Sequence, residues 1–165
     1  MRNLKSSNKS NNSLKIKKAI DKAMKLALRE LEYEDVSIND LKKIKIKSGI
    51  YIISAKVLAD IKYPKGIKNH PKLNSNYQHN NNKTETVLYV GKSLNSLGTR
   101  IRQHFNLKKN SKTYSLKLDS WQKGIFDEYN IKIIEIPNEG NTNSNLINLI
   151  ENYFWDNKNP IFGKK

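Results

Sequence analysis

The chain of 165 residues carries 31 Lys+Arg against 15 Asp+Glu, a formal net charge of +16 at pH 7, and 36% of its residues are hydrophobic. This balance predicts one modest core and a polyanionic partner, either nucleic acid or an anionic membrane face, although a merely lysine-rich soluble protein has the same composition. Because cysteine is absent and no apolar run reaches the roughly twenty residues of a membrane span, disulfide frameworks, thiolate catalysis and membrane insertion are excluded, and a cytoplasmic location is expected.

Two N-terminal segments are predicted to lie outside the core. Residues 1–13 are polar, basic and low in complexity, which predicts a flexible arm. Residues 14–46 are predicted to form a basic amphipathic helix and a connection, because apolar residues recur at helical spacing from residue 14 to residue 31. The lysines on the opposite face include Lys18 and Lys22, which we expect to contact nucleic-acid phosphates. That face could instead rest on a membrane or simply be solvated.

A first strand is predicted within residues 43–53, KIKIKSGIYII. Ile44 and Ile46 alternate with lysines before the run becomes fully apolar, which is the pattern of a strand whose far end is buried on both faces. Gly49 would let the backbone bend or approach another segment closely.

Residues 56–85 are predicted to be a long basic insertion between two strands, rich in Asn, Gln, Lys and Tyr. Asn and Gln suit adenine edges in DNA and Lys suits guanine, so the insertion is a candidate for base recognition. A solvated, disordered loop has the same composition, and both interpretations stay open at this stage.

The remaining elements complete a small sheet. A second strand is predicted over residues 86–90, a helix over residues 97–105 and a second helix around residues 115–129. A third strand over residues 130–137 ends at a proline. The expected fold class is therefore α+β, with a small three-stranded antiparallel sheet flanked by helices.

The last helix is predicted to begin near Ser144, a candidate N-cap residue. Its apolar stripe is expected to comprise Leu146, Leu149, Ile150, Tyr153 and Phe154. Glu151 lies beside this stripe, where a carboxylate is costly unless a cation meets it. A divalent metal, an arginine or exposure at the helix border would each satisfy it.

The helix over residues 97–105 is predicted to have two faces. The positions expected to face the core are Leu97, Ile101 and Phe105. Arg100 and His104 are four residues apart and share another face. Arg100 and Arg102 are two of the few arginines in the chain, and a planar guanidinium suits phosphate. An ordinary charged surface helix is the alternative.

Tyr51 and Tyr89 each lie in a predicted strand near a glycine. Because side chains alternate across a sheet, a suitable register of the two strands puts both phenols on one face. Tyrosine is also common in strands for packing alone.

Taken in order, these residues resemble the GIY-YIG nuclease family. The resemblance rests on Gly49-Ile50-Tyr51, on Tyr89-Val90-Gly91-Lys92, on Arg100 with His104, and on Glu151. It covers residues 47–163 and implies a three-stranded antiparallel sheet flanked by helices, one divalent metal and hydrolysis of a DNA phosphodiester. Residues 47–165 would then form the nuclease core, with the insertion at 56–85 inside it.

The resemblance implies catalytic roles for Tyr51, Tyr89, Lys92, Arg100, His104 and Glu151. Arg100 would bind the scissile phosphate, Glu151 would hold Mg²⁺ or Mn²⁺, and Tyr51 would take a proton from the attacking water. The residues implied to contact DNA in the core are Lys92, Arg100 and Arg102. A phenol has an unperturbed pKa of about 10, so it is a poor base at neutral pH unless nearby cations lower that pKa.

One position departs from the family pattern. Many members end the core with a proline, any residue, an aromatic residue and an asparagine that assists at the active site. Here Pro160-Ile161-Phe162 is followed by Gly163, so that side chain is missing. Asn159 is a candidate substitute.

The small size, the basic helix and the long insertion make the chain most like the small type II restriction endonucleases of the family. Such an enzyme would act as a homodimer on a short symmetric site in double-stranded DNA. The alternatives are a phage-type DNA-degrading endonuclease and a DNA-binding protein that has lost catalysis.

Overall fold

The computed structural model describes residues 15, 18–19, 22–29, 31–61, 70–75, 77, 85–108, 114–137 and 141–163. The chain divides into two compact units, Met1–Glu32 and Tyr33–Lys165. In the first unit residues 22–29 are helical, and the predicted lysines Lys18 and Lys22 are both helical and exposed. The arm predicted at residues 1–13 lies outside the described residues. Within the described part of the chain, no helix combines the length and apolarity that a membrane span needs.

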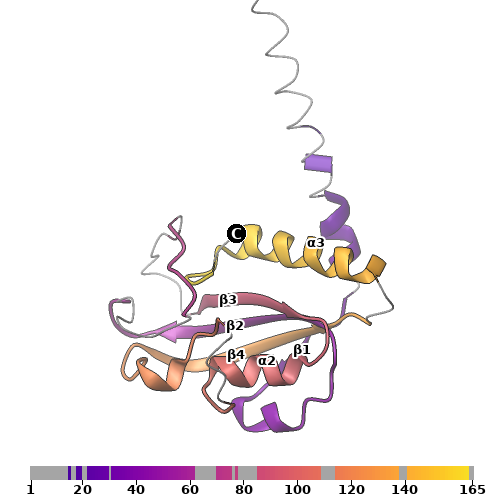
Figure 1. The fold of residues 1–165 in the computed structure, drawn as a ribbon. Helices are drawn as coiled ribbons and strands as arrows, with labels where there is room; N and C mark the ends of the chain where they lie inside the picture. Colours follow the sequence, from indigo (N-terminus) through magenta and orange to yellow (C-terminus); the bar gives the residue numbers. More distant parts are fainter. Residues whose placement is uncertain are drawn as a thin grey trace, which may run out of the picture. The chain divides into compact units, whose positions relative to one another are not determined.

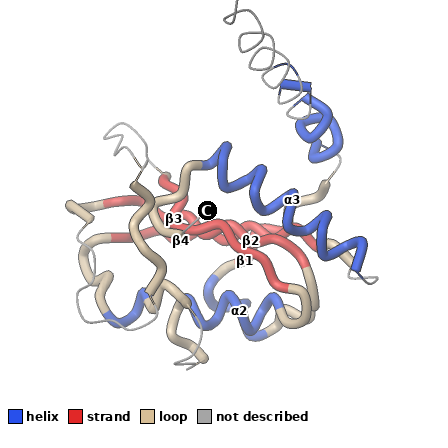
Figure 2. The backbone as a smooth tube through the Cα atoms, turned by 45° about the horizontal axis from the view of Figure 1, so that its top comes forward, coloured by secondary structure: helices blue, strands red, loops and turns tan. Residues whose placement is uncertain are grey.

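The second unit is a four-stranded antiparallel sheet with helices on both faces (Figure 1). Its strands are β1 (Glu34–Val36), β2 (Gly49–Val57), β3 (Thr86–Ser93) and β4 (Phe126–Glu135), arranged in the order β1-β4-β2-β3. Helix α3 (Asn141–Lys158) covers one face, and α2 (Leu97–His104) lies on the other, together with the 3₁₀ turn η1 (Ile38–Lys42) (Figure 2). The predicted α+β class is confirmed.

The sheet has one strand more than predicted. Residues 34–36 were placed in a connection, but β1 pairs with β4, with Glu34 opposite Ile133 and Val36 opposite Ile131. The segment has only three residues, two of them exposed acids, so it carries no alternating pattern from which a strand could be predicted.

Strand β2 begins later than predicted, at Gly49, and continues past the predicted end to Val57. Its pairing begins at Gly49, which lies opposite Glu135, the last residue of β4. Ile44 and Ile46 therefore have no strand partner and pack against the core as irregular backbone. A Cβ added to Gly49 would lie 2.1 Å from the carbonyl oxygen of Ile134, so the predicted close approach of backbone at this glycine is confirmed.

The prediction of a helix around residues 115–129 was wrong. That segment holds only a short 3₁₀ turn, η2 (Leu118–Ser120), and then enters β4 at Phe126. Lys117 and Gly124 adopt positive φ angles of 50° and 73°, which a continuous right-handed helix does not allow.

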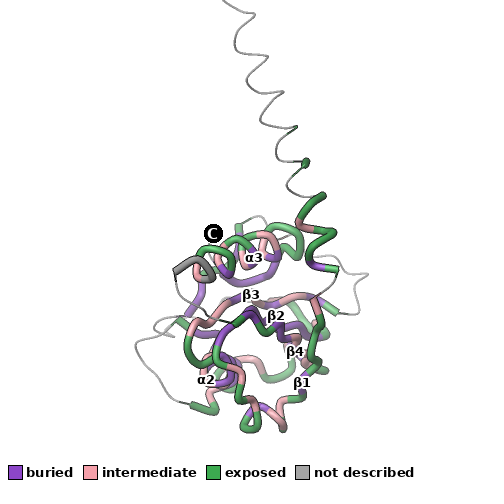
Figure 3. The backbone as a smooth tube through the Cα atoms, turned by 90° about the vertical axis from the view of Figure 1, so that its right-hand side faces the viewer, coloured by how far each residue is buried: buried purple, intermediate pink, exposed green. Residues whose placement is uncertain are grey.

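Helix α3 begins earlier than predicted and buries a different stripe. It starts at Asn141, so Ser144 lies inside the helix rather than at its N-cap. Its buried apolar positions are Ile147, Ile150 and Phe154, whereas Leu146 and Leu149 are 44% and 49% exposed. The apolar residues of this segment fit two overlapping stripes, and packing on the sheet selects one of them (Figure 3).

The main core lies on the α2 face of the sheet. It includes the predicted positions Leu97, Ile101 and Phe105. Part of the insertion joins this unit, because Asn74 donates its backbone N–H to the carbonyl of Ile161 at 2.8 Å. The insertion and the C-terminal segment thus meet beside β3. The backbone N–H of Ile161 donates to the carbonyl of Val87 in that strand at 3.0 Å.

Candidate active site

Tyr51 and Tyr89 lie on the same face of the sheet. Tyr51 is paired with Gly91, and Ile53 with Tyr89, so the two phenols are diagonal neighbours on adjacent strands. Their rings stack with centroids 6.1 Å apart. The shared face predicted for these tyrosines is confirmed.

Gly91 provides the space in which both rings lie. A Cβ added at this position would be 2.5 Å from the hydroxyl oxygen of Tyr51 and 2.7 Å from Cε1 of Tyr89. The phenol of Tyr51 therefore crosses over β3, which is the edge strand of the sheet. No side chain larger than hydrogen fits beneath it.

Gly91→Ala is expected to reduce the activity of the site at least about a hundredfold, because displacing a reacting group by about 1 Å has such an effect. Overpacking should also lower the free energy of unfolding by about 1–3 kcal/mol. Gly124→Ala is the matched control for activity alone: an added Cβ meets nothing within 4 Å, but its φ of 73° strains any side chain, so this variant is expected to lose stability while it keeps activity. Urea unfolding measures the stability of both variants, an enzymatic assay measures their activity, and a fully active Gly91→Ala protein would contradict this packing.

His104 is buried and holds the hydroxyl of Tyr51. Its Nε2 lies 2.9 Å from the Tyr51 hydroxyl oxygen, and the backbone N–H of Leu116 donates to its Nδ1 at 3.1 Å. Burial and the neighbouring charge of Arg100 hold the pKa of His104 well below its usual range, so the ring is neutral at pH 7. Since Nδ1 accepts, the single ring proton is on Nε2 and is donated to Tyr51.

The guanidinium of Arg100 is held in place by two acceptors. Its Nη1 donates to Oε1 of Gln103 at 3.1 Å, and its Nη2 donates to the carbonyl of Tyr114. Sequence reasoning missed Gln103, a buried amide three residues after Arg100 on the same helix. Only that i, i+3 spacing could have indicated its role.

Both phenols keep their protons at neutral pH in the free protein. Burial raises the pKa of Tyr51 well above its usual value, and Tyr89 raises it further, while the Arg100 charge lowers it. Burial likewise raises the pKa of Tyr89, again against the effect of Arg100. A phenolate at this site therefore requires additional positive charge or a higher pH.

Glu151 reaches the site from α3. Its Oε2 accepts a hydrogen bond from Nζ of Lys92 at 2.6 Å, and Lys92 also donates to Oδ1 of Asn148. Lys92 lies opposite Ile50 in the β2–β3 register, so it points to the sheet face opposite Tyr51. After the larger effect of burial, the Glu151 charge also raises the pKa of both tyrosines.

The donor set at Glu151 fits a hard divalent cation. A carboxylate and an amide oxygen, from Glu151 and Asn148, already converge on one ammonium group. Mg²⁺ commonly keeps several waters and takes one or two protein carboxylates. Among the described residues there is no cluster of three His, Cys, Asp or Glu side chains, so a single carboxylate with water ligands is the arrangement that these residues allow.

Of the predicted DNA contacts within the second unit, Arg102 is not part of this constellation. Arg102 donates to the carbonyl of Leu41 at 2.8 Å and to the hydroxyl of Thr99 at 3.0 Å, so it ties α2 to η1. Lys18 and Lys22 belong to the first unit.

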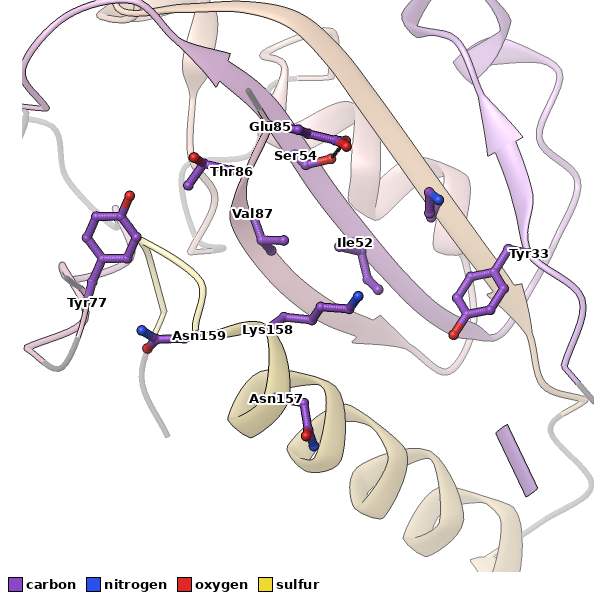
Figure 4. A pocket seen from close by; sticks show the side chains of 11 residues that line it. Tyr33, Ile52, Ser54, Tyr77, Glu85, Thr86, Val87, Asn157, Lys158 and Asn159 are labelled. Carbon is purple, nitrogen blue, oxygen red and sulfur yellow. Dashed lines mark hydrogen bonds between the residues drawn. The ribbon is translucent and has the colours of Figure 1, made fainter. Parts of the chain in front are cut away.

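Asn159 does not take the place of the missing asparagine side chain. Its Oδ1 accepts from Nδ2 of Asn74 at 2.9 Å, and it lines a cavity of about 480 Å³ together with Ile52 and Ser54, on the sheet face opposite the tyrosines (Figure 4). Gly163 is the residue near Tyr89, because a Cβ added to it would lie 3.7 Å from Cε2 of that ring.

Two phenols, a fixed arginine and a cation-binding carboxylate around one strand edge have the chemistry of a phosphate-ester site. Residues 49–126 match the family model of the GIY-YIG catalytic domain. The match spans Tyr51, Tyr89 and the candidate residues of α2, ends before Glu151, and supports an endonuclease function with DNA as substrate. No curated protein and no solved structure matches the chain.

Proposed function

We propose that the protein is a metal-dependent endonuclease that hydrolyses DNA phosphodiester bonds at a short, specific double-stranded site, as type II restriction enzymes do. The observation that carries the proposal is the Tyr51–His104 hydrogen bond beside Arg100, within a segment that matches a nuclease domain. The high positive charge of the chain fits a DNA partner.

Arg100 binds the scissile phosphate. Its contacts with Gln103 and Tyr114 fix the guanidinium before substrate arrives, so little ordering is needed when the phosphate binds. Arg100 thereby balances the negative charge that grows on the phosphoryl oxygens during attack.

Glu151, with Asn148 beside it, would hold Mg²⁺ or Mn²⁺, which supplies positive charge to the developing charge on the leaving oxygen. Lys92 balances the Glu151 carboxylate when that cation is absent. This single-carboxylate site has the few protein ligands that Mg²⁺ tolerates.

Tyr51 accepts the proton of the attacking water as the water oxygen bonds to phosphorus and the bond from phosphorus to the leaving oxygen breaks. The Nε2–H of His104 stabilises the phenolate form of Tyr51, since it donates to the same oxygen. The leaving oxygen takes up a proton from solvent. Tyr89 packs against both rings and fixes their positions.

Digestion of a sequenced plasmid with purified protein tests the proposal. With Mg²⁺ we expect a discrete set of fragments whose ends map to one sequence, and with EDTA no cleavage. A smear of fragments would instead indicate a DNA-degrading nuclease, and DNA binding without cleavage would indicate an inactive binder. A symmetric recognition sequence together with a dimeric mass in solution would support the homodimer that we propose.

A further inference from the structure

Trp155 lies on the same face of α3 as Glu151. The two residues are four apart in a continuous helix, so their side chains lie one above the other. Both are partly buried, so part of each residue remains exposed to solvent. A residue in this position borders any substrate that reaches the Glu151 carboxylate.

The indole of Trp155 and the ring of Tyr89 both lie close to Gly163. A Cβ added to Gly163 would lie 3.0 Å from Nε1 of Trp155 and 3.7 Å from Cε2 of Tyr89. Gly163 has a φ of 128°, and its N–H donates to the carbonyl of Lys72 at 2.9 Å. The backbone is thus fixed in a conformation that excludes side chains, and the indole nitrogen borders the space where one would begin.

The N–H of this indole has no acceptor among the described residues. The other tryptophan, Trp121, donates its Nε1–H to the carbonyl of Leu116 at 2.7 Å. Tryptophan N–H groups at partly buried positions usually find a partner. The donor at Trp155 is therefore available to a ligand at the edge of the site.

We propose that Trp155 contacts the DNA strand next to the cleaved bond, with its indole N–H donating to a backbone phosphate oxygen. The proposal rests on the proposed function, since it requires DNA at the Glu151 edge. In this proposal the missing asparagine side chain at position 163 is not needed as a hydrogen-bond donor. The donor comes instead from Trp155 on α3, and glycine at position 163 leaves room for it. A neutral donor adds a directional contact to the phosphate without adding charge.

Indole NMR resonances of the Glu151→Gln protein provide the test, because this variant leaves DNA uncut. The chain has two tryptophans, and their Nε1–H signals are assigned with Trp121→Phe and Trp155→Phe. On titration with a short DNA duplex in EDTA, we expect the Trp155 signal to move downfield while the Trp121 signal stays in place. DNA binding that leaves the Trp155 signal unmoved overturns this inference alone, whereas absence of any DNA binding overturns the proposed function as well.

A binding measurement adds a second readout. Trp155→Phe keeps an aromatic ring and removes the donor, so duplex affinity should fall about tenfold, the usual effect of losing a hydrogen bond to a charged group. Tyr153→Phe removes a donor from the same helix and should leave affinity unchanged. Equal affinities of the Trp155→Phe and wild-type proteins, measured by fluorescence anisotropy, would contradict the contact.

Discussion

Glu151→Gln is expected to reduce the rate of Mg²⁺-dependent DNA cleavage by roughly a thousandfold. A bound metal contributes several kcal/mol of transition-state stabilisation, and each 1.4 kcal/mol is about tenfold in rate. Glutamine keeps the shape and an oxygen that accepts from Lys92, so the fold should be retained. DNA binding in EDTA should change little, because the substitution removes no group that contacts phosphate.

The matched control for Glu151 is Asp156→Asn, which neutralises an exposed acid on the same helix. This variant should cleave at the wild-type rate, since a general change in charge is not the cause of the predicted loss. Plasmid cleavage rates, anisotropy with a duplex, and thermal unfolding of both variants separate catalysis from binding and stability. Mg²⁺-dependent cleavage at the wild-type rate by Glu151→Gln would exclude Glu151 as the metal ligand.

Sequence reasoning located the sheet face that carries both tyrosines because that face depends on local rules. Alternation across β2 and β3 was enough to put Tyr51 and Tyr89 on one side, and helical spacing was enough to bury Leu97 while Arg100 faced elsewhere. The sequence motif Tyr89-Val90-Gly91 was enough to single out the glycine at position 91. Why a glycine is required there became clear only from the strand register, which places the phenol of Tyr51 over Gly91.

The parts that sequence reasoning missed depend on contacts between distant segments. The tautomer of His104 is set by the N–H of Leu116, in a segment that the sequence predicted to be helical. The sequence predicted a DNA contact for Arg102 but not the hydrogen bond that its guanidinium donates to the carbonyl of Leu41. Asn148 is three residues before Glu151 on α3, so helical spacing makes the two side chains neighbours, but the Lys92 side chain that contacts both comes from a distant strand.

Tyr51→Phe is expected to reduce cleavage about a hundredfold to ten-thousandfold, the usual contribution of a positioned general base. Phenylalanine keeps the stacked ring and removes one hydroxyl, so packing against Tyr89 is preserved. Tyr89→Phe is the matched control, and its effect should be much smaller because no hydrogen bond joins the Tyr89 hydroxyl to His104. If Tyr89→Phe were inactive and Tyr51→Phe active, the roles of the two tyrosines would be reversed.

The pH dependence of cleavage distinguishes a base from a packing residue. Since burial raises the pKa of Tyr51, its phenolate is scarce at neutral pH and its fraction grows with rising pH. The rate constant kcat/KM should therefore rise about tenfold per pH unit from neutral to alkaline pH, which is the slope for loss of one proton. Because the pKa of His104 is lowered, no acid limb near the usual histidine pKa should appear. In Tyr51→Phe the residual rate should lose this dependence, and a wild-type profile that is flat from neutral to alkaline pH would exclude Tyr51 as the base.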